Sequence, residues 1–252
     1  MPLNKAWTLA SFPSGWVSEE NFKLVESAVP PPKDGEVLVK NLWLSLDPYM
    51  RGRISQQRSY AKGVEIGEVM QGQAAGEVLE SKHPGLNIGD KVLTQLGWQL
   101  YGCVKGGEAT KVDAARAPLS AYLGVLGMPG MTAYFGLNEV GQPNKGETVV
   151  VSAASGAVGS VVGQLAKIAG CRAVGIAGGR QKCDYVAKEL GFDACVDYKA
   201  GNLHRDLKEA CPKGVDVYFE NVGGEILDTM LRLMNPFSRI VVCGLISDYN
   251  AT

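Results

Sequence analysis

The chain has 252 residues, of which 46% are hydrophobic and 20% are charged, as is typical of a globular protein that buries a core. Its 25 basic and 26 acidic residues are interleaved and give a net charge of −1, which argues against the basic surface of a nucleic-acid-binding or membrane-surface protein. Neither a signal peptide nor a membrane-spanning run is visible. The six cysteines form no Cys-x-x-Cys pair and are typical of free thiols in a reducing compartment. We therefore expect a cytoplasmic protein.

Residues 1–125 show a pattern of short strands separated by turns. The run 37–44 (VLVKNLWL) is rich in strand-forming residues and follows a turn at 30–35 that contains three prolines and a glycine. Two further short strands, 76–80 and 89–93, begin at glycine turns. Short strands at close intervals are typical of a small barrel-like β domain.

From residue 126 to residue 252 the pattern changes to strands and helices in alternation. Five runs are predicted to be strands: 148–152, 173–176, 194–196, 215–219 and 239–243. Four helices are predicted between them: 158–169, 181–190, 203–210 and 225–234. The β-branched run Val149-Val150-Val151 is typical of a strand that is covered on both faces. The alternation predicts an α/β fold with a doubly wound parallel sheet in this half of the chain.

A dinucleotide site is predicted at the turn after the first of these strands. Residues 154–159 read ASGAVG, which matches the G-x-G-x-x-G fingerprint except that Ala154 replaces the first glycine. Gly156 lets the backbone approach a pyrophosphate, while Gly159 and Gly163 allow tight helix packing. The helix that follows offers its N-terminal N–H groups to the anion. The alternative is a turn that serves the fold alone.

The end of the second parallel strand indicates which dinucleotide binds. An NAD site needs a carboxylate about 20 residues past the glycines, to accept hydrogen bonds from the ribose 2′-hydroxyl. This chain has residues 177–182, AGGRQK, which include no acid and two cations. Lys182 and Arg180 could receive a 2′-phosphate, although for Arg180 a solvated charge at a helix start is an open alternative. The sequence therefore favours NADPH.

No metal ligand set or nucleophile motif can be assembled from the sequence. The only histidines are His83 and His204, and the cysteines lack the spacing of zinc ligands. There is no Gly-x-Ser-x-Gly elbow. The chain is left with hydride chemistry supplied by a cofactor, with a tyrosine, the ribose hydroxyl or water stabilising the oxyanion.

Five segments resemble one family and occur in the same order along the whole chain. They are 46–51 (LDPYMR), 127–134 (GMPGMTAY), 153–159 (AASGAVG), 220–224 (ENVGG) and 243–250 (CGLISDYN). They resemble the prostaglandin reductase (leukotriene hydroxydehydrogenase) family of zinc-free medium-chain dehydrogenase/reductases, which includes plant double-bond reductases and bacterial curcumin reductase. The resemblance implies a GroES-like first domain, a Rossmann second domain with five of six strands, a missing C-terminal part and a homodimer when full length.

The resemblance also implies the cofactor contacts. Residues Gly156, Ala157, Val158 and Gly159 would hold the pyrophosphate. Lys182 and Tyr198 match positions that bind the 2′-phosphate, and Asn221 matches a cofactor contact at the end of the fourth strand. Cys243, Gly244 and Tyr249 belong to a loop that matches the one along the nicotinamide ribose.

Two tyrosines and an arginine are implied to act on the substrate. Tyr249 matches the catalytic tyrosine that orders the ribose hydroxyl and the substrate carbonyl. Tyr49, also a catalytic candidate, and Arg51 match the wall of the substrate cleft, although Tyr49 is equally well explained as a packed aromatic near a turn. Because the chain stops soon after the fifth strand, we also expect Ile240, Val242 and Leu245 to be poorly covered.

The predicted activity is NADPH-dependent reduction of the C=C bond of α,β-unsaturated ketones and aldehydes, with hydride transfer to the β-carbon. The expected partner is a small enone or enal, and no nucleic acid or membrane. Two alternatives are kept: an NADPH quinone reductase on the same scaffold, and an NADPH-binding protein without turnover.

Overall fold

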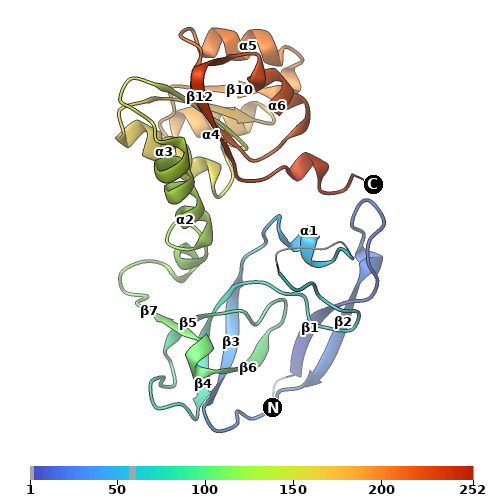
Figure 1. The fold of residues 1–252 in the computed structure, drawn as a ribbon. Helices are drawn as coiled ribbons and strands as arrows, with labels where there is room; N and C mark the ends of the chain where they lie inside the picture. The colour runs from blue at the N-terminus through green and yellow to red at the C-terminus, as the bar shows by residue number, and fades with distance from the viewer. Residues whose placement is uncertain (1–2, 57–60, 252) are drawn as a thin grey trace. The chain divides into compact units, whose positions relative to one another are not determined.

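The computed structural model describes residues 3–56 and 61–251, which fold into two compact units (Figure 1). The first unit is Met1–Gly124 with Asn250–Thr252, and the second is Val125–Tyr249. In the described part of the chain, none of the helices combines the length and the apolar character needed to cross a bilayer.

The first unit is built from two antiparallel sheets. A hairpin-like pair is formed by β1 (Leu3–Leu9) and β2 (Phe22–Ala28). A second sheet has the strand order β6-β3-β4-β5-β7. Its strands are β3 (Glu36–Leu44), β4 (Ala74–Ser81), β5 (Lys91–Thr94), β6 (Tyr101–Lys105) and β7 (Thr110–Val112). The predicted β domain is thus confirmed.

Helices are few and short in the described part of the first unit. They are α1 (Met50–Arg53) and the 3₁₀ turns η1 (Glu19–Asn21), η2 (Gly106–Glu108) and η3 (Leu119–Leu123). The core of the larger sheet consists of fully buried valines and leucines, among them Val37, Val39, Val78 and Val92. Val37 and Val39 are two residues apart on β3 and therefore point to the same face, while Leu38 between them is also buried.

An open apolar groove of about 550 Å³ lies in the first unit. It is lined mainly by tryptophans and leucines, including Trp7, Leu42, Trp43 and Leu46. Tyr49 and Arg51, the predicted substrate-binding residues of this unit, do not line it. The groove is therefore a separate feature of the surface of this unit.

The second unit is a doubly wound parallel sheet, as predicted. Its strand order is β10-β9-β8-β11-β12, and every pair is parallel. The strands are β8 (Thr148–Ser152), β9 (Arg172–Ala177), β10 (Ala194–Asp197), β11 (Val215–Glu220) and β12 (Met234–Val242). The helical segments are α2 (Met128–Phe135), η4 (Gly136–Gly141), α3 (Gly159–Ile168), α4 (Arg180–Lys188), η5 (Tyr198–Ala200), α5 (Leu203–Ala210), α6 (Gly224–Leu231) and η6 (Ile246–Asp248).

Two cores sandwich this sheet, because successive side chains of a strand point to opposite faces. Val149 and Val151 of β8 belong to the core that includes residues of α2, α3 and α4. Val150 belongs to the other core, with Leu207 of α5 and Met230 of α6. Burial on both faces explains why the β-branched run of β8 was recognisable in the sequence.

The predicted helix 225–234 is wrong at its end. Helix α6 stops at Leu231, and Met234 already belongs to β12, where it pairs with Val215. The register is then interrupted before Arg239, and Phe237 in the interruption has a left-handed φ of 63°. Pro236 disfavours the helical conformation at Asn235, so it does not account for the end at Leu231.

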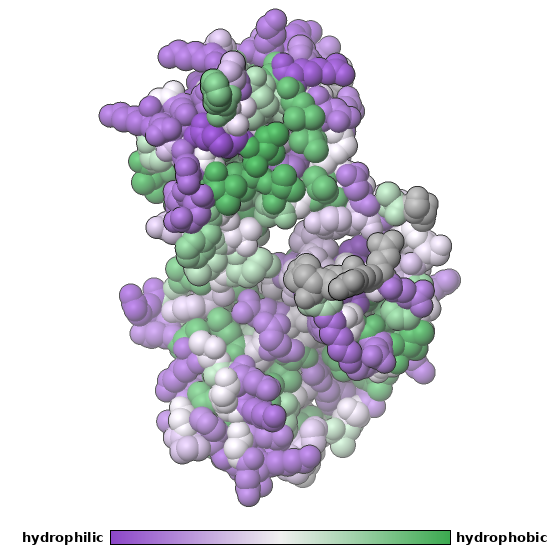
Figure 2. Space-filling view, in the orientation of Figure 1, coloured by the Kyte–Doolittle hydropathy of each residue, from purple (hydrophilic) through white to green (hydrophobic). Residues whose placement is uncertain are grey.

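Strand β12 is the edge of the described sheet, and it is only partly covered. Val242 is 66% exposed, whereas Ile240 and Leu245 are half-buried. The expectation of poor cover therefore holds fully only for Val242. Exposed apolar side chains, Phe237 and Ile246 among them, contribute to the apolar surface of the second unit, part of which is green in the upper part of Figure 2.

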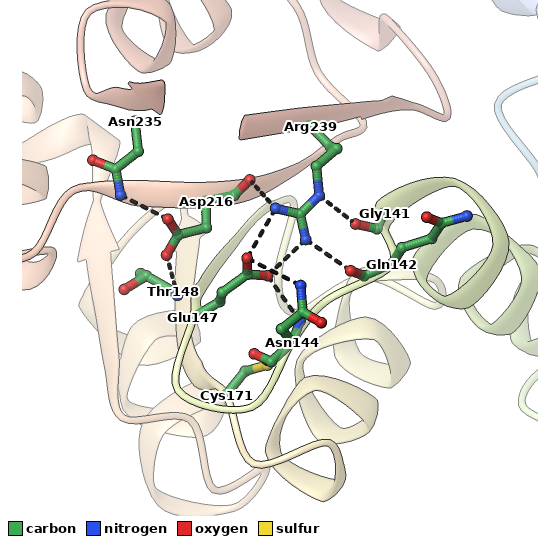
Figure 3. Close-up of polar contacts among 9 residues, drawn as sticks. All are labelled: Gly141, Gln142, Asn144, Glu147, Thr148, Cys171, Asp216, Asn235 and Arg239. Atoms are coloured by element: carbon green, nitrogen blue, oxygen red, sulfur yellow. Dashed lines mark hydrogen bonds and ion pairs between the residues drawn. The ribbon is translucent and has the colours of Figure 1, made fainter. Parts of the chain in front are cut away.

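A polar cluster anchors β12 at the end of the sheet where β8 and β11 begin (Figure 3). The Arg239 guanidinium donates to both carboxylate oxygens of Glu147, at 2.6 and 3.0 Å, and to the carbonyls of Gly141 and Gln142 at 2.9 and 2.8 Å. The hydrogen bond from Arg239 is the main cause that lowers the pKa of Glu147 to about 2. Asp216 joins the cluster by accepting the Thr148 N–H at 2.8 Å. The cluster thus ties the edge strand to the start of β8.

Candidate functional site

The five strands of the second unit are parallel, so their carboxyl ends lie along one edge of the sheet. After β8 the chain runs outward through β9 to β10, and it then returns to place β11 on the other side of β8. Ligands of open α/β sheets bind outside the carboxyl ends of the strands at such a reversal. Each predicted cofactor residue follows one of these strand ends, so the fold gathers them along this edge.

The glycine turn after β8 is packed closely against neighbouring backbone and side-chain atoms. Ala153 adopts a left-handed φ of 51°, which is uncommon outside glycine, and its carbonyl accepts the Gly156 N–H at 2.8 Å. A Cβ on Gly159 would lie 2.3 Å from the Ala153 oxygen, and one on Gly163 would lie 1.8 Å from the Phe192 ring. Both glycines are therefore required by packing.

Gly156 differs from these two glycines. A Cβ there would meet the Ala153 oxygen at 3.1 Å, which is tight without being a clash, and the residue is exposed together with Ala157. No side chain caps the N-terminus of α3 at Val158. The exposed turn therefore presents backbone next to a helix start, where N–H groups and the helix dipole favour an anion.

The end of β9 carries the predicted 2′-phosphate ligands. Lys182 is exposed, and within the described part of the chain its ammonium group pairs with no carboxylate. The ring and hydroxyl of Tyr198 lie against Gly178, where a Cβ would be 2.8–3.0 Å from them. Arg180 has a 94% exposed side chain, 3.9 Å from Asp184. The fold thus brings Tyr198 to the turn that leads into Lys182, although their contact with a phosphate stays a prediction.

Asp197, which the sequence analysis missed, connects the ends of β9 and β10. Its Oδ1 accepts the N–H of Gly179 at 2.7 Å and of Lys199 at 3.0 Å. These two backbone hydrogen bonds are the main cause that lowers the pKa of Asp197. An aspartate at a strand end before a turn is a recognisable signal for such bonds. Asp197 therefore holds the Gly178-Gly179 turn in place from the neighbouring strand.

A buried carboxylate, also missed from the sequence, organises the reversal between β8 and β11. Glu220 is fully buried and accepts hydrogen bonds from the hydroxyls of Ser152 and Tyr218, each at 2.8 Å. Burial, and then the adjacent Glu220, raise the pKa of Tyr218, which stays a proton donor. Ser152 Oγ in turn accepts the N–H of Asn221 at 2.7 Å, and the Asn221 amide donates to the Ser152 carbonyl at 2.8 Å. Asn221 is thus held at the strand ends by two hydrogen bonds to Ser152.

The loop after β12 is fastened to the same edge. The Glu220 carbonyl accepts the N–H groups of Cys243 and Gly244, at 2.9 and 3.1 Å. The backbone N–H and the hydroxyl of Ser247 donate to the Val222 carbonyl. These contacts join the predicted nicotinamide loop to the segment that contains Asn221.

Tyr249 closes this loop over Gly244. A Cβ on Gly244 would lie 3.0 Å from the Tyr249 hydroxyl oxygen and 3.5 Å from the Asn221 carbonyl. The hydroxyl oxygen accepts the Leu245 N–H at 3.4 Å, and the residue is 36% exposed. The structure therefore brings Tyr249, Gly244 and Asn221 together, whereas Cys243 is an exposed neighbour.

Tyr49 and Arg51 belong to the first unit. Tyr49 is half-buried before α1, with the Arg53 guanidinium 5.2 Å from the centre of its ring. Arg51 donates to the side chain of Asn250 at 2.8 Å and to the Gly15 carbonyl at 2.9 Å. Arg51 therefore links Asn250 to the segment that contains Gly15. A role of Tyr49 or Arg51 in substrate binding stays a prediction.

The fold and the strand-end geometry define a two-domain, dinucleotide-dependent oxidoreductase. Residues 5–112 match the family model described as "N-terminal domain of oxidoreductase", and residues 157–251 match "Zinc-binding dehydrogenase". Among residues 3–56 and 61–251, however, no three histidines, cysteines or acids are grouped so as to hold a metal ion. The described residues thus do not fit the zinc that the second description implies.

The similarity to known proteins runs through nearly the whole chain. The chain is 51% identical to the NADPH-dependent curcumin reductase of Escherichia coli K12, covering 99% of this chain and 72% of that protein. It is 44% identical to a tobacco NADP⁺-dependent 2-alkenal reductase, covering 98% and 74%. The crystal structure of CurA with NADPH from Vibrio vulnificus is 48% identical, with a TM-score of 0.95, covering 98% and 74%.

The chain belongs to the curcumin, prostaglandin and alkenal reductase family of the medium-chain dehydrogenase/reductases. The family and the fold class predicted from the sequence, a GroES-like domain and a Rossmann domain, are both confirmed.

Proposed function

We propose that the protein is an NADPH-dependent reductase of the C=C bond of α,β-unsaturated ketones and aldehydes. The observation that carries the proposal is the carboxyl edge of the parallel sheet, where the glycine turn, the acid-free end of β9 and the Tyr249 loop are gathered. The printed names of the relatives, which are reductases of curcumin and of 2-alkenals, support the same activity.

The residues of the edge fit NADPH better than NADH. The turn 156–159 and the start of α3 would hold the pyrophosphate, with Gly156 and Ala157 exposed to it. Lys182 and Tyr198 would contact the 2′-phosphate, because residues 177–182 include a cation and no acid of their own. The nearby Asp197 carboxylate of β10 is engaged by the N–H groups of Gly179 and Lys199. Asn221, Cys243 and Gly244 would contact the nicotinamide half.

The chemistry requires a hydride and a group that stabilises charge on the substrate oxygen. When bound, the nicotinamide supplies the hydride that the β-carbon receives. Tyr249 would donate a hydrogen bond towards the substrate oxygen, where negative charge develops as the C=C bond is reduced. The Leu245 N–H, which donates to the Tyr249 hydroxyl oxygen at 3.4 Å, would help to keep that hydroxyl in place. Tyr49 and Arg51 would line the substrate cleft.

A cofactor-consumption assay tests the proposal and separates it from the two alternatives. The purified chain would be mixed with NADPH and, in parallel reactions, with a small enone, a quinone or no acceptor. The proposal predicts consumption with the enone and recovery of the saturated ketone. Consumption with the quinone alone would indicate a quinone reductase, and binding without any consumption would indicate a protein that does not turn over.

Three further properties belong to the same proposal. We infer a cytoplasmic location from the unpaired cysteines, activity without a metal ion from the absence of a ligand pattern in the sequence, and a homodimer of the full-length protein from the family resemblance. Light scattering during size-exclusion chromatography would measure the mass of the full-length protein in solution, and a monomer at all concentrations would contradict the last inference.

A further inference from the structure

Two cysteines that are distant in the sequence meet beside the predicted 2′-phosphate site. Cys183 lies in the first turn of α4 and Cys195 lies in β10. Both are free and half-buried, and the Cys195 thiol donates to Cys183 with the sulfur atoms 3.0 Å apart. In the described part of the chain, no other two cysteines form such a contact.

The pair joins two elements that also carry predicted cofactor contacts. Lys182 directly precedes Cys183 on α4, and Tyr198 follows the end of the strand that holds Cys195. Asp197 of the same strand already fixes Gly179 through its backbone N–H. A covalent bond between α4 and β10 would therefore act where the turn, Lys182 and Tyr198 are held together.

We propose that Cys183 and Cys195 are a modification site, which a small-molecule disulfide oxidises to an intramolecular disulfide, and that this disulfide weakens NADPH binding. The effect on NADPH rests on the proposed function, in which Lys182 contacts the 2′-phosphate. Formation of the disulfide rests on the geometry of the two thiols alone.

The chemistry is two successive thiol–disulfide exchanges. One cysteine loses its proton to water and attacks the small disulfide, so that a mixed disulfide forms and one small thiolate leaves. The second cysteine, also deprotonated, then attacks the protein sulfur of the mixed disulfide and expels the other small thiolate. Both leaving thiolates take up a proton. The two protein thiols are oxidised, and one small disulfide is reduced to two thiols.

The contact between the two thiols, rather than a low pKa of either one, favours a disulfide between Cys183 and Cys195. Burial is the main cause that raises the pKa of both Cys183 and Cys195, so neither is a reactive thiolate at neutral pH. Once one of them has reacted, however, the other is already in contact with it. Closing the bond shortens the distance between the sulfur atoms from 3.0 Å to about 2.05 Å, which moves the first turn of α4 relative to β10.

The experiment compares the reduced chain with the chain incubated with oxidised glutathione. Peptide mass mapping would identify the bonded cysteines, and fluorescence titration would give the dissociation constants for NADPH and NADH. Cys183→Ser and Cys195→Ser each remove one partner. Cys103→Ser is the matched control, because Cys103 lies in the other unit and its thiol donates to the Pro30 carbonyl.

We expect a Cys183–Cys195 peptide in the wild type and in Cys103→Ser, and none in the other two variants. Losing one charge-assisted contact costs about tenfold in affinity. Displacement of Lys182 by the disulfide should therefore raise the NADPH dissociation constant about threefold to tenfold. NADH binding should not change, and a reducing agent should restore the NADPH affinity.

Two results would overturn the proposal. One is that Cys183 and Cys195 stay reduced, or carry only glutathione, while no peptide joins them. The other is that the joined peptide forms quantitatively and the NADPH affinity stays the same. Equal affinity of the reduced chain for NADPH and NADH would instead contradict the cofactor assignment, and with it the coupling, while the peptide map would still decide whether the disulfide forms.

Discussion

The ion pair between Glu147 and Arg239 offers a stability prediction whose size follows from the structure. The variant Glu147→Gln keeps the shape of the side chain and removes its charge. Lowering the pKa of Glu147 from 4.5 to about 2 corresponds to about 3 kcal/mol at neutral pH, at 1.36 kcal/mol per unit. The two side chains are 22% and 27% exposed, so solvent screening reduces this value, and we expect a loss of about 2 kcal/mol.

The free energy that Glu147 contributes to stability must depend on pH in a defined direction. Because the pKa of Glu147 is lower in the folded state, its contribution is complete above the unfolded value of 4.5 and is lost as the pH falls through about 2. At about pH 3, roughly 40% of the contribution should remain. Glu139→Gln is the control, since Glu139 is exposed on η4 and its carboxylate forms no ion pair with the described residues.

Urea unfolding with two probes would measure this effect. Trp7, Trp16, Trp43 and Trp98 are the only tryptophans of the chain and all lie in the first unit, so tryptophan fluorescence reports on that unit. Far-UV circular dichroism also detects the sheet and helices of the second unit. The circular dichroism transition of Glu147→Gln should shift at neutral pH and shift less at about pH 3. An equal shift at both pH values, or none at neutral pH, would refute the reasoning.

Four further predictions concern the proposed site. Lys182→Ala should raise the NADPH dissociation constant about tenfold or more and leave NADH binding unchanged, as measured by fluorescence titration, because it removes a charge-assisted contact. Tyr249→Phe should lower kcat at least about tenfold with NADPH affinity intact, whereas Tyr49→Phe should mainly raise KM; an unchanged kcat in Tyr249→Phe would move the donor role elsewhere. Glu220→Gln should lower kcat and reduce the melting temperature, because one buried acceptor for Ser152 or Tyr218 becomes a donor. Dialysis against a chelator should leave the rate unchanged, and a loss that zinc restores would contradict metal-independent activity.

The periodicity of the sequence predicted the parallel sheet because the signal is strong where strands are covered on both faces. Val149 to Val151 are fully buried, and no polar residue interrupts them. The end of α6 was missed because Leu231 and Met234 continue the apolar spacing of a helix. The structure instead places Met234 beside Val215 in the sheet. A local pattern cannot show a partner strand that is distant in the sequence.

The sequence offers candidate site residues where one residue type at one position decides the chemistry. The glycine turn is of this kind, since the fingerprint fixes its spacing, whereas Lys182 follows from the missing acid and the family resemblance. The contacts of both with a cofactor stay predictions. The position of Asp197 at a strand end indicates its bond to the nearby Lys199 N–H. Its bond to Gly179, and the bond of Glu220 to Ser152, join segments that are distant in the sequence, so the sequence alone could not show them. The contact between Cys183 and Cys195 likewise depends on the packing of α4 against β10. These features became visible only when the strand order was known.

Transfer of deuterium from labelled cofactor to product tests the central claim most directly. The chain would be incubated with a small enone and with NADPH deuterated at the reactive nicotinamide carbon, and the product would be examined by NMR and mass spectrometry. The account predicts a saturated ketone with the deuterium on the β-carbon, and much slower formation when NADH replaces NADPH. An allylic alcohol with deuterium on the former carbonyl carbon would contradict it, as would an unchanged enone in the presence of bound NADPH.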